Sequence, residues 1–482
     1  MINLKELTIE KAHESLQQGE YTCRELTEAY LKVIQEKNLE LNAYVEVFAD
    51  ALTQADEAQK KFQNKTATLL TGIPFAIKDN ILFLGHKASA GSKILENYTA
   101  SYDAFVIQKL KEEGAVILGR TNMDEFAMGS STQTSYYGVC KNPLDTSRVP
   151  GGSSGGSAAA LASDMALVAL GTETCGSVRE PSAFCGLVGL KPTYGAVSRN
   201  GIIAMGNSLD QVSPFGKNVA DVEIIFNVLA KFDKKDSTSV PENLRKSSAT
   251  GATPAVGQGS ASGGKKIGVP WHLFQEGVDP LIMENFKSSL DKLKNAGYEI
   301  VDIELPHSKY SLAVYYIIMP AEVSTNLSRF DGMRYGFHQD DPNLWEVYKK
   351  SRGQGFGLEA RRRILLGTYV LSHGYYDAYY NKAIKVREKI KKEVIQAFEK
   401  VDLIVTPTVP FLPFKIGEKM DDPVAMYLCD IFSAPANLAG VPSMALPSGK
   451  TLEGLPFSIQ FMAPHFSEKI LFEVGRKFEI IR

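Results

Sequence analysis

The sequence predicts an α/β fold in which a β-sheet is packed between helices. Short apolar runs (LLTGIPFAIKDNI, AVILGRT and MALVALGTET) alternate with glycine-rich turns and helical stretches from about residue 67 onward. Such alternation is typical of strands that pack against helices. The composition also suits a large core, because 44% of the 482 residues are hydrophobic and 22% are charged, as in ordinary globular proteins.

The first sixty residues are expected to form N-terminal helices. Apolar residues recur at helical spacing over the first forty residues. Thr22 followed by Glu25 has the form of a capping box, which satisfies exposed N–H groups at a helix start. We therefore expect a helix that begins there and runs to about Glu36.

The second half of the sequence resumes the alternation after a polar insertion. Residues 247–264, SSATGATPAVGQGSASGG, consist mostly of small residues and predict a surface insertion. IGVPWHLF and the segment DPLIMENFKSSLDKLKNAGYEIVDIEL then predict a strand, a helix and a strand. Residues 310–400 are expected to be mainly helical, VDLIVTPTVP to be a strand, NLAGVPSMALPSG to be rich in turns, and the last fifteen residues to be helical. We expect one domain over residues 1–482, although a boundary at the insertion is an alternative.

Charge and cysteine content favour a cytoplasmic enzyme. The 53 basic and 55 acidic residues give a net charge of −2, which disfavours RNA binding by this chain alone. The five cysteines include no C-x-x-C pair, so a reducing compartment is expected. The first residues mix acids and bases, unlike a signal peptide, and no apolar run approaches the ~20 residues of a membrane span.

Histidine spacing gives no support to a metal site. No two of the seven histidines lie closer than 31 residues, so the sequence has no local pair of the kind that binds zinc, and we expect no metal. No histidine and acid lie beside a candidate serine either, although a Ser-His-Asp triad can assemble from distant positions.

Two segments rich in glycine and serine are the strongest candidates for a reactive site. Gly151–Ser157 runs into the helix-forming AAALAS, and Gly171–Ser177 follows an apolar run. Each segment could be no more than a tight turn that caps a helix. Glycines also let the backbone approach a reacting group, while serines present hydroxyls near helix N–H groups that favour negative charge.

These segments, GGSSGGSAAA and GTETCGSVREPSAFCGLVGLKPTYG, resemble the amidase signature family, as does GIPFAIKDN upstream. The resemblance runs from the N-terminal helices to the last helix and leaves out only residues 247–264. NMDEFAMGSST, NLSRFDGMRYG and GYYDAYYNKAIKVR are similar to one group in that family, the A subunits of glutamyl-tRNA(Gln) amidotransferases. The resemblance implies an α/β/α sandwich with a central mixed β-sheet covered by helices.

The resemblance also implies a catalytic triad of Lys78, Ser153 and Ser177, separated by 75 and 24 residues. Ser177 would be the nucleophile, and Lys78 would be the base that acts through Ser153 on a cis peptide bond. A lysine with its free pKa of about 10.4 is protonated and cannot act as a base, so the site must bury it. The apolar IPFAI before Lys78 agrees with burial, whereas a solvated lysine beside Asp79 is the alternative.

The backbone N–H groups of the segment after the glycine-rich run would form the oxyanion hole. The residues concerned are Thr174, Cys175, Gly176 and Ser177. The sequence departs from the family here, since relatives usually carry glycine at Cys175 and aspartate at Glu173. A Cβ at position 175 would be costly if its φ were positive. Cys175 also offers a thiol nucleophile as an alternative, and both departures leave open an inactive scaffold.

The resemblance assigns three residues to glutamine. Asp430 would bind the amino group, Arg363 the carboxylate, and Tyr315 would lie beside them, since an ammonium and a carboxylate are recognised by an acid and an arginine. Each residue has an alternative role: Arg363 as a solvated arginine, Asp430 as a helix cap and Tyr315 as a core aromatic.

The implied function is glutamine hydrolysis through a Ser177 acyl-enzyme, which releases ammonia. The resemblance implies a heterotrimer in which the B subunit uses ATP and Mg to convert Glu-tRNA(Gln) to Gln-tRNA(Gln), and a small C subunit wraps the chain that hydrolyses glutamine. Charged tRNA would be held mainly by the partner, and this chain itself would carry no cofactor. A free-standing amidase that acts on a small amide is the alternative, and the sequence leaves open whether Asp-tRNA(Asn) is also a substrate.

Overall fold

The apolar runs form the strands of one β-sheet. The protein is described by a computed structural model that covers residues 2–245, 265–274 and 277–482. The strands of the described residues are β1 (Tyr44–Val47), β2 (Pro74–Lys78), β3 (Val116–Thr121), β4 (Val168–Glu173), β5 (Val188–Lys191), β6 (Gln211–Gly216), β7 (Lys266–Val269), β8 (Glu299–Asp302), β9 (Leu403–Pro407), β10 (Ser443–Lys450) and β11 (Pro456–Met462).

The sheet is mixed, as the family resemblance predicts. Its strand order is β1-β3-β2-β4-β6-β5-β10-β11-β9-β7-β8. Strands β3, β2 and β4 run parallel to one another, as do β8, β7 and β9. The strands between these two groups pair antiparallel. The carboxyl ends of β2 and β4 therefore point to the same edge of the sheet.

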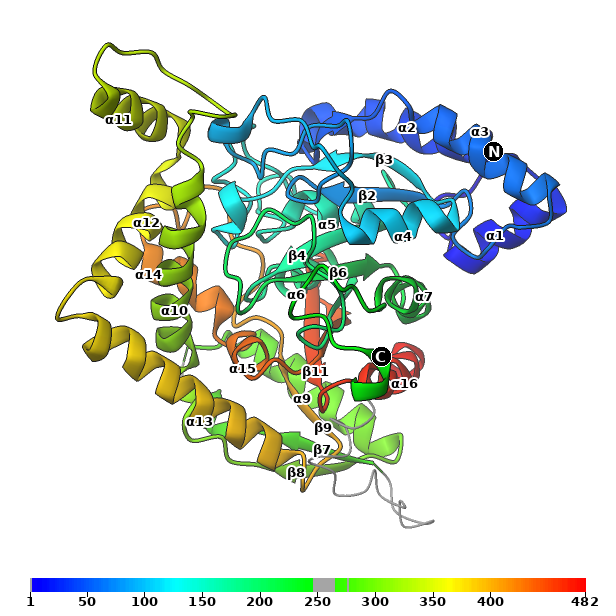
Figure 1. The fold of residues 1–482 in the computed structure, drawn as a ribbon. Helices are drawn as coiled ribbons and strands as arrows, with labels where there is room; N and C mark the ends of the chain where they lie inside the picture. Colours follow the sequence, from blue (N-terminus) through cyan, green and yellow to red (C-terminus); the bar gives the residue numbers. More distant parts are fainter. Residues whose placement is uncertain (1, 246–264, 275–276) are drawn as a thin grey trace.

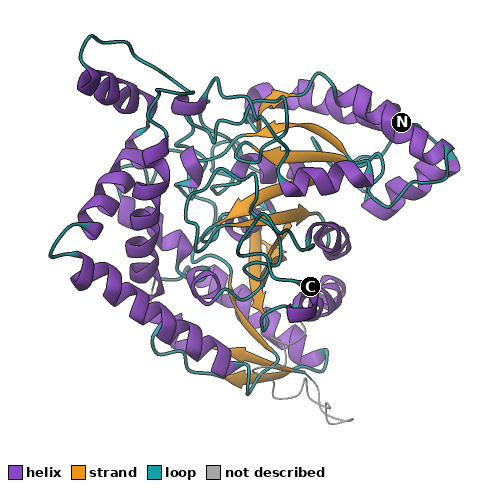
Figure 2. Ribbon diagram, in the orientation of Figure 1, coloured by secondary structure: helices purple, strands orange, loops and turns teal. Residues whose placement is uncertain are grey.

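Helices cover the sheet, which confirms the predicted α/β fold. They are α1 (Ile9–Gln18), α2 (Cys23–Leu41), α3 (Ala51–Gln63), α4 (Phe105–Glu113), α5 (Gly155–Ala162), α6 (Arg179–Cys185), α7 (Val219–Leu229), α9 (Pro280–Asn295), α10 (Ser311–Asn326), α11 (Leu344–Gly355), α12 (Leu358–Leu371), α13 (Lys382–Ala397), α14 (Pro423–Tyr427), α15 (Ala434–Ala439) and α16 (Glu468–Ile481). Figure 1 shows α10, α12 and α13 to the left of the sheet and α7 and α16 to its right. The strands run as a band between these layers (Figure 2).

The N-terminal region agrees with the sequence except in two respects. The capping box is confirmed, because Thr22 Oγ1 accepts from the Glu25 N–H and Glu25 Oε2 accepts from the Thr22 N–H. The helix that it opens, α2, extends beyond the expected end near Glu36 to Leu41. The first sixty residues are also not purely helical, since they contain the edge strand β1, which pairs with β3. Its sequence, Tyr-Val-Glu-Val, is rich in residues that favour strands.

In the second half of the sequence, the structure contradicts one of the predicted elements. The strand, helix and strand after the insertion are confirmed as β7, α9 and β8, as are the helices between residues 310 and 400, strand β9 and the last helix. The segment NLAGVPSMALPSG is not a run of turns, because it contains the end of α15 and most of β10. Residues 247–264 lie outside the described residues, so the expected insertion is not tested.

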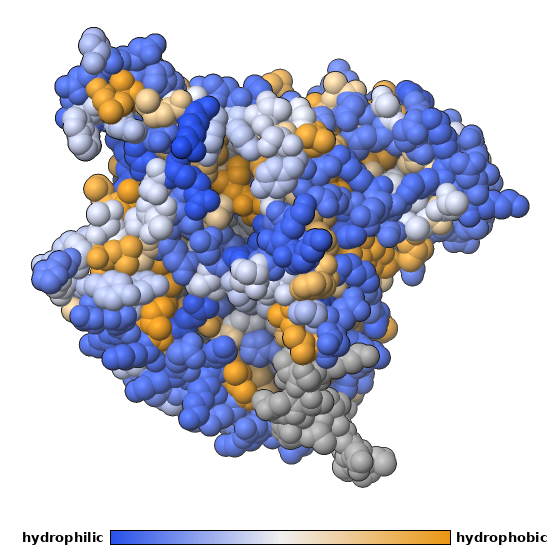
Figure 3. All heavy atoms as spheres, in the orientation of Figure 1, coloured by the Kyte–Doolittle hydropathy of each residue, from blue (hydrophilic) through white to orange (hydrophobic). Residues whose placement is uncertain are grey.

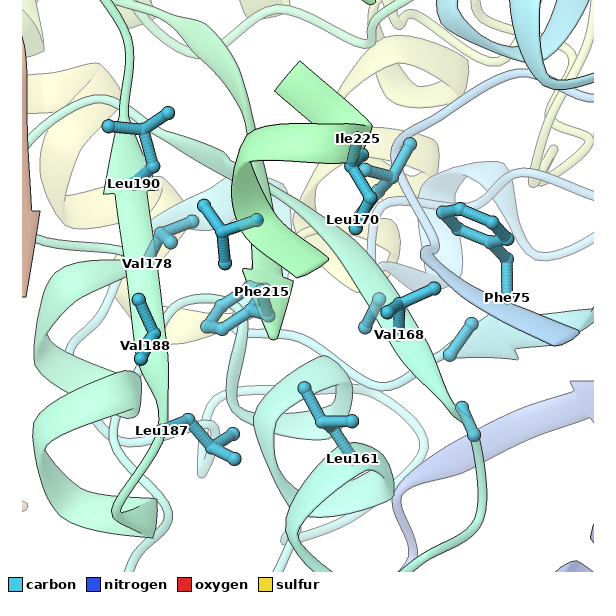
Figure 4. Packing of buried hydrophobic residues seen from close by; sticks show 14 of the residues in the cluster. Phe75, Leu161, Val168, Leu170, Val178, Leu187, Val188, Leu190, Phe215 and Ile225 are labelled. Atoms are coloured by element: carbon cyan, nitrogen blue, oxygen red, sulfur yellow. The ribbon is translucent and has the colours of Figure 1, made fainter. Parts of the chain in front are cut away.

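The core lies between the sheet and its helices. Figure 4 shows Leu161 of α5 and Ile225 of α7 on opposite sides of the strands that carry Val168, Leu170 and Phe215, and all five side chains are buried. This packing fixes α5, and with it the serine-rich segment that precedes α5, against β4. Among the described residues, no helix is long and apolar enough to cross a membrane.

A glycine sets how closely α12 approaches α10. A Cβ built on Gly367 would lie 1.8 Å from the carbonyl oxygen of Pro320, so alanine at this position must push the two helices apart. We expect Gly367→Ala to lower the free energy of unfolding by about 1–3 kcal/mol, measured by urea denaturation. Gly353 of α11 is the matched control, because a Cβ there meets nothing within 4 Å. Gly353→Ala should be neutral or stabilising by up to about 1 kcal/mol, and equal losses in both variants would contradict the packing argument.

Candidate active site

Lys78 is the last residue of β2 and is fully buried. Its Nζ lies 2.7 Å from Ser153 Oγ and 3.2 Å from the carbonyl oxygen of Thr172. The peptide bond between Gly152 and Ser153 is cis, as the family resemblance implies. Lys78 is therefore not a solvated lysine, and the neighbouring Asp79 is bound to Arg120, whose Nη1 donates to Asp79 Oδ1 over 2.6 Å.

The surroundings of Lys78 favour its neutral form. Burial lowers the pKa of Lys78 to about 7, although the negative charges of Asp124, Asp210 and Glu173 raise it in part. Desolvation therefore outweighs three nearby carboxylates. A lysine with this pKa has a substantial neutral fraction at neutral pH and can accept a proton there.

Ser177 lies in the loop between β4 and α6, beside the Lys78–Ser153 pair. The Ser154 N–H donates to the Ser177 carbonyl oxygen over 3.2 Å, which holds the two serine segments side by side. In the described part of the chain, the Ser177 hydroxyl forms no hydrogen bond. The structure therefore shows the hydrogen bond between Lys78 and Ser153, but it shows none between the hydroxyls of Ser153 and Ser177. Catalytic hydrogen bonds are often long without substrate.

Glu173 shapes this loop. Its Oε2 accepts from the N–H groups of Val178 and Arg179 at 3.1 Å each, and its Oε1 accepts from Arg179 Nε at 2.8 Å. The Arg179 guanidinium beside Glu173 holds the pKa of that carboxyl below its usual range, against the effect of burial. Glutamate in place of the family's aspartate therefore still closes the loop and caps the start of α6.

The loop that Glu173 closes presents a set of backbone donors. Within the ranges that the structure describes, no protein acceptor binds the backbone N–H of the four residues predicted to form the oxyanion hole, Thr174, Cys175, Gly176 and Ser177. Buried N–H groups are rarely unpaired. Their free state here fits a role in holding a negatively charged oxygen.

Cys175 fits this loop without strain. Its φ is not positive, whereas Gly176 has a φ of 76°, so the left-handed position is the one that glycine occupies. Burial raises the pKa of the Cys175 thiol well above its usual range. A protonated thiol is a poor nucleophile, which favours Ser177 over Cys175.

The residues predicted to bind glutamine lie together beside this loop. A Cβ on Gly176 would come within 2.8 Å of Asp430 Oδ1, so Asp430 borders the oxyanion segment. Asp430 Oδ1 is buried without a partner, while Oδ2 accepts from the Tyr316 hydroxyl over 2.7 Å. Tyr315 packs edge-on against Tyr316, with 4.9 Å between ring centroids. Burial raises the pKa of Asp430 to about 7, and a bound ammonium would favour its ionised form.

Arg363, on α12, is buried and is not one of a set of solvated arginines. Its Nε donates to Glu359 Oε1 over 2.5 Å, and its guanidinium lies 4.8 Å from the Tyr316 ring and 4.6 Å from the Tyr427 ring. In the described residues its Nη2 has no acceptor. Arg363, Glu359 and Tyr427 line a cavity of about 150 Å³, and its lining also includes Ser130 and Ser131. The Nη2 edge of this guanidinium is therefore available to a carboxylate.

Sequence reasoning missed three neighbours of these residues: Tyr316, Glu359 and Tyr427. The spacing of Glu359 and Arg363 on a helix, four residues apart, is a signal that could have identified the first partner of Arg363. Nothing local in the sequence relates Tyr427 to either of them.

No cluster of three or more histidine, cysteine, aspartate or glutamate side chains in the described ranges is placed to hold a metal ion.

Known proteins resemble this chain in sequence over almost its full length. The family model described as Amidase matches residues 25–472. The glutamyl-tRNA(Gln) amidotransferase A subunit of Syntrophus aciditrophicus is 46% identical over 480 residues, covering 99% of this chain and 98% of that one. The corresponding protein of Koribacter versatilis is 47% identical over 481 residues, covering 99% of each chain.

Solved structures agree in fold. The crystal structure of the glutamyl-tRNA(Gln) amidotransferase A subunit from Thermotoga maritima has a TM-score of 0.78 and 37% identity, and the match covers 98% of this chain and 94% of that one. Native peptide amidase from Stenotrophomonas maltophilia has a TM-score of 0.81 and 29% identity, with 99% and 97% covered. The chain belongs to the amidase family, and its most similar curated relatives in that family include the A subunits of glutamyl-tRNA(Gln) amidotransferases.

Proposed function

We propose that this chain is the glutamine-hydrolysing subunit of a glutamyl-tRNA(Gln) amidotransferase. The observation that carries the chemistry is the buried pair of Lys78 and Ser153, 2.7 Å apart, beside a loop of unpaired N–H groups. The relatives named above, which share 46–47% identity with the chain over almost its full length, support glutamine as the amide.

The proposed reaction begins with Ser177. Its Oγ attacks the side-chain amide carbon of glutamine as its proton passes to Ser153, while Ser153 passes a proton to neutral Lys78. The N–H groups of residues 174–177 bind the oxyanion, an effect usually worth several kcal/mol of the barrier. The C–N bond then breaks, and the proton returns through Ser153 to the leaving nitrogen, which departs as ammonia. Water cleaves the acyl ester through the same relay and releases glutamate.

Recognition of glutamine is assigned to three residues on the later helices. Asp430, with an oxygen that lacks a partner, would receive the ammonium of the substrate. Arg363 would bind the carboxylate through the side of its guanidinium that Glu359 leaves open, and Tyr315 would pack beside both groups. A charged pair that is buried and hydrogen-bonded recognises such a zwitterion with defined geometry.

Ammonia released here would serve a partner protein in a cytoplasmic heterotrimer. The B subunit would use ATP and Mg to activate Glu-tRNA(Gln) and would hold most of the tRNA, and the C subunit would wrap this chain, which itself would need no cofactor.

About half of the exposed large hydrophobic side chains in the described residues lie between Met333 and Leu428. Figure 3 shows apolar atoms of this kind on the protruding helix α11 at the upper left. Surface apolar groups concentrated in one region are typical of interaction sites.

The decisive experiment compares the isolated chain with the reconstituted heterotrimer. We expect the complex to hydrolyse glutamine and to form Gln-tRNA(Gln) only with ATP and Glu-tRNA(Gln). Turnover of simple amides by the isolated chain, with no response to the partners, would instead indicate a free-standing amidase. An acyl probe that labels neither the wild type nor Ser177→Ala in either setting would indicate an inactive scaffold, and Asp-tRNA(Asn) can be tested in the same assay.

A further inference from the structure

Glu125 is a buried acid that the proposed chemistry leaves without a role. It lies in the segment after β3 and is 2% exposed, yet it lines the same cavity as Arg363 and Glu359. Burial raises the pKa of Glu125 to about 7, against the hydrogen bonds from Ser92 and Gly357 and the charge of Arg361. A buried carboxyl costs folding free energy that an apolar side chain of similar size would avoid.

The carboxyl of Glu125 contacts the start of α12. Both of its oxygens accept from the N–H of Gly357, at 3.1 and 2.9 Å, and Gly357 is the N-cap residue of α12. Oε1 also accepts from the Ser92 hydroxyl at 2.5 Å. A Cβ on Gly357 would lie 2.4 Å from Glu125 Oε2, so the carboxyl occupies the place of a side chain there. A carboxylate at a helix N-terminus is favourable because exposed N–H groups and the helix dipole meet it.

The residue next to Glu125 binds another segment of the cavity lining. Asp124, next to Glu125, accepts from the N–H groups of Ser131 and Thr132 at 3.2 and 2.8 Å. Ser131, like Arg363, lines the cavity. Two adjacent acids therefore hold two segments of the cavity lining, one through backbone N–H groups of residues 131–132 and the other through the N-terminus of α12.

Arg363 lies on α12 only six residues beyond Gly357. A shift or tilt of the N-terminus of α12 moves its guanidinium relative to Ser131. We propose that Glu125 is a positioning residue for the substrate, which fixes the first turn of α12 and thereby holds Arg363 where it meets the carboxylate of the bound amino acid. The inference rests on the proposed function, because it assigns glutamine as the ligand.

The test separates carboxylate recognition from catalysis. Glu125→Gln keeps the shape of the side chain but weakens its bonds to Gly357 and Ser92. The reconstituted complex is assayed with glutamine and with 4-aminobutanamide, which is glutamine without its α-carboxylate. We expect the KM for glutamine to rise about ten-fold with kcat changed less than about two-fold. The kcat/KM for 4-aminobutanamide should stay within about two-fold of the wild-type value.

A matched control removes another buried carboxylate of the same kind. Asp221 accepts from the N–H of Ile9, the first residue of α1, at 2.9 Å, and it does not line the cavity. Asp221→Asn should lower the melting temperature without changing the KM for glutamine. If Glu125→Gln fails to fold, Ser92→Ala provides a milder variant, because it removes one donor to the carboxylate. Ser92→Ala should then raise the KM for glutamine about two-fold and leave the other amide unaffected.

Three results would overturn the inference. The first is an unchanged KM for glutamine in Glu125→Gln, and the second is an equal loss on both amides, which would indicate a general structural role. In both cases the wild type still hydrolyses glutamine, so the proposed function survives. The third is a wild-type complex that hydrolyses 4-aminobutanamide but not glutamine, which overturns the proposed function and the inference together.

Discussion

Ser177→Ala is expected to abolish glutamine hydrolysis by the reconstituted complex, with kcat reduced about 10⁴-fold or more. The hydroxyl forms the covalent bond to the substrate, and members of a nucleophile relay act as a unit, so the remaining groups cannot compensate. The variant should fold normally, because the Ser177 hydroxyl makes no hydrogen bond in the described residues. Initial rates of ammonia release, together with a melting curve, measure both effects.

Cys175→Ala is the control for this loss. The Cys175 side chain is buried, and its Sγ lies 3.6 Å from Ser433 Oγ, while the proposed oxyanion hole uses only its backbone N–H. Activity should therefore fall by less than about ten-fold, with a stability loss of about 1 kcal/mol for the small cavity. Loss of activity in Cys175→Ala but not in Ser177→Ala would show that the nucleophile is the thiol.

Lys78→Met is expected to be inactive and yet at least as stable as the wild type at pH 7. Burial lowers the pKa of Lys78 to about 7, so the unfolded chain binds this proton more readily than the folded one. The resulting cost to folding is largest below about pH 7, and it disappears as the pH rises toward the unfolded value of about 10.4. Methionine has no proton to bind, so the variant avoids this cost.

The same pKa predicts the pH profile of the wild type. Activity should rise with pH through one ionisation near 7, as neutral Lys78 becomes available. Urea denaturation of the wild type and of Lys78→Met between pH 6 and 10 should show the stability difference shrinking as the pH rises. A Lys78→Met protein markedly less stable at pH 7 would mean that the folded state holds a charged, paired lysine.

Lys191 provides a matched comparison for Lys78. It is also fully buried, and burial together with the charge of Arg179 lowers the pKa of Lys191 to about 7. Its Nζ donates to the carbonyl oxygen of Pro192 over 2.9 Å and not to a serine. Lys191→Met should keep the ionisation near 7 in the activity profile. Loss of that ionisation in Lys191→Met would show that Lys191, and not Lys78, is the group that titrates in the activity profile.

The sequence predicted the sheet because strands depend on local signals, whereas the pairing of Lys78 with Ser153 was implied by the family resemblance. Apolar runs between glycine-rich turns identify buried strands without knowledge of their neighbours. β10 was missed because Pro447 and Gly449, which usually mark turns, lie inside it, where the pairing with β11 has an irregular register. The single domain and the roles of the site residues remain predictions.

The surroundings of Arg363 could not be predicted from the sequence in the same way. Tyr316 of α10 and Tyr427 of α14 stack on each other, with 4.0 Å between ring centroids, and both rings lie beside its guanidinium. Their positions depend on how three helices pack. The same is true of Glu125, whose bond to Gly357 joins residues 232 positions apart. Contacts of this kind leave no period or spacing in the sequence, because only tertiary packing brings the partners together.

The residues proposed to carry out the reaction and the residues proposed to recognise the substrate lie in different parts of the sequence. Lys78, Ser153 and Ser177 lie within one hundred residues and are held by strands and by the helices packed on them, whereas Tyr315, Arg363 and Asp430 come from helices further along. Mutations in the later helices can therefore alter which amide is accepted without changing the three residues proposed to form the acyl-enzyme. We expect such a layout to be evolvable, so that a new amide specificity is best sought by diversifying α10, α12 and the segment around α14.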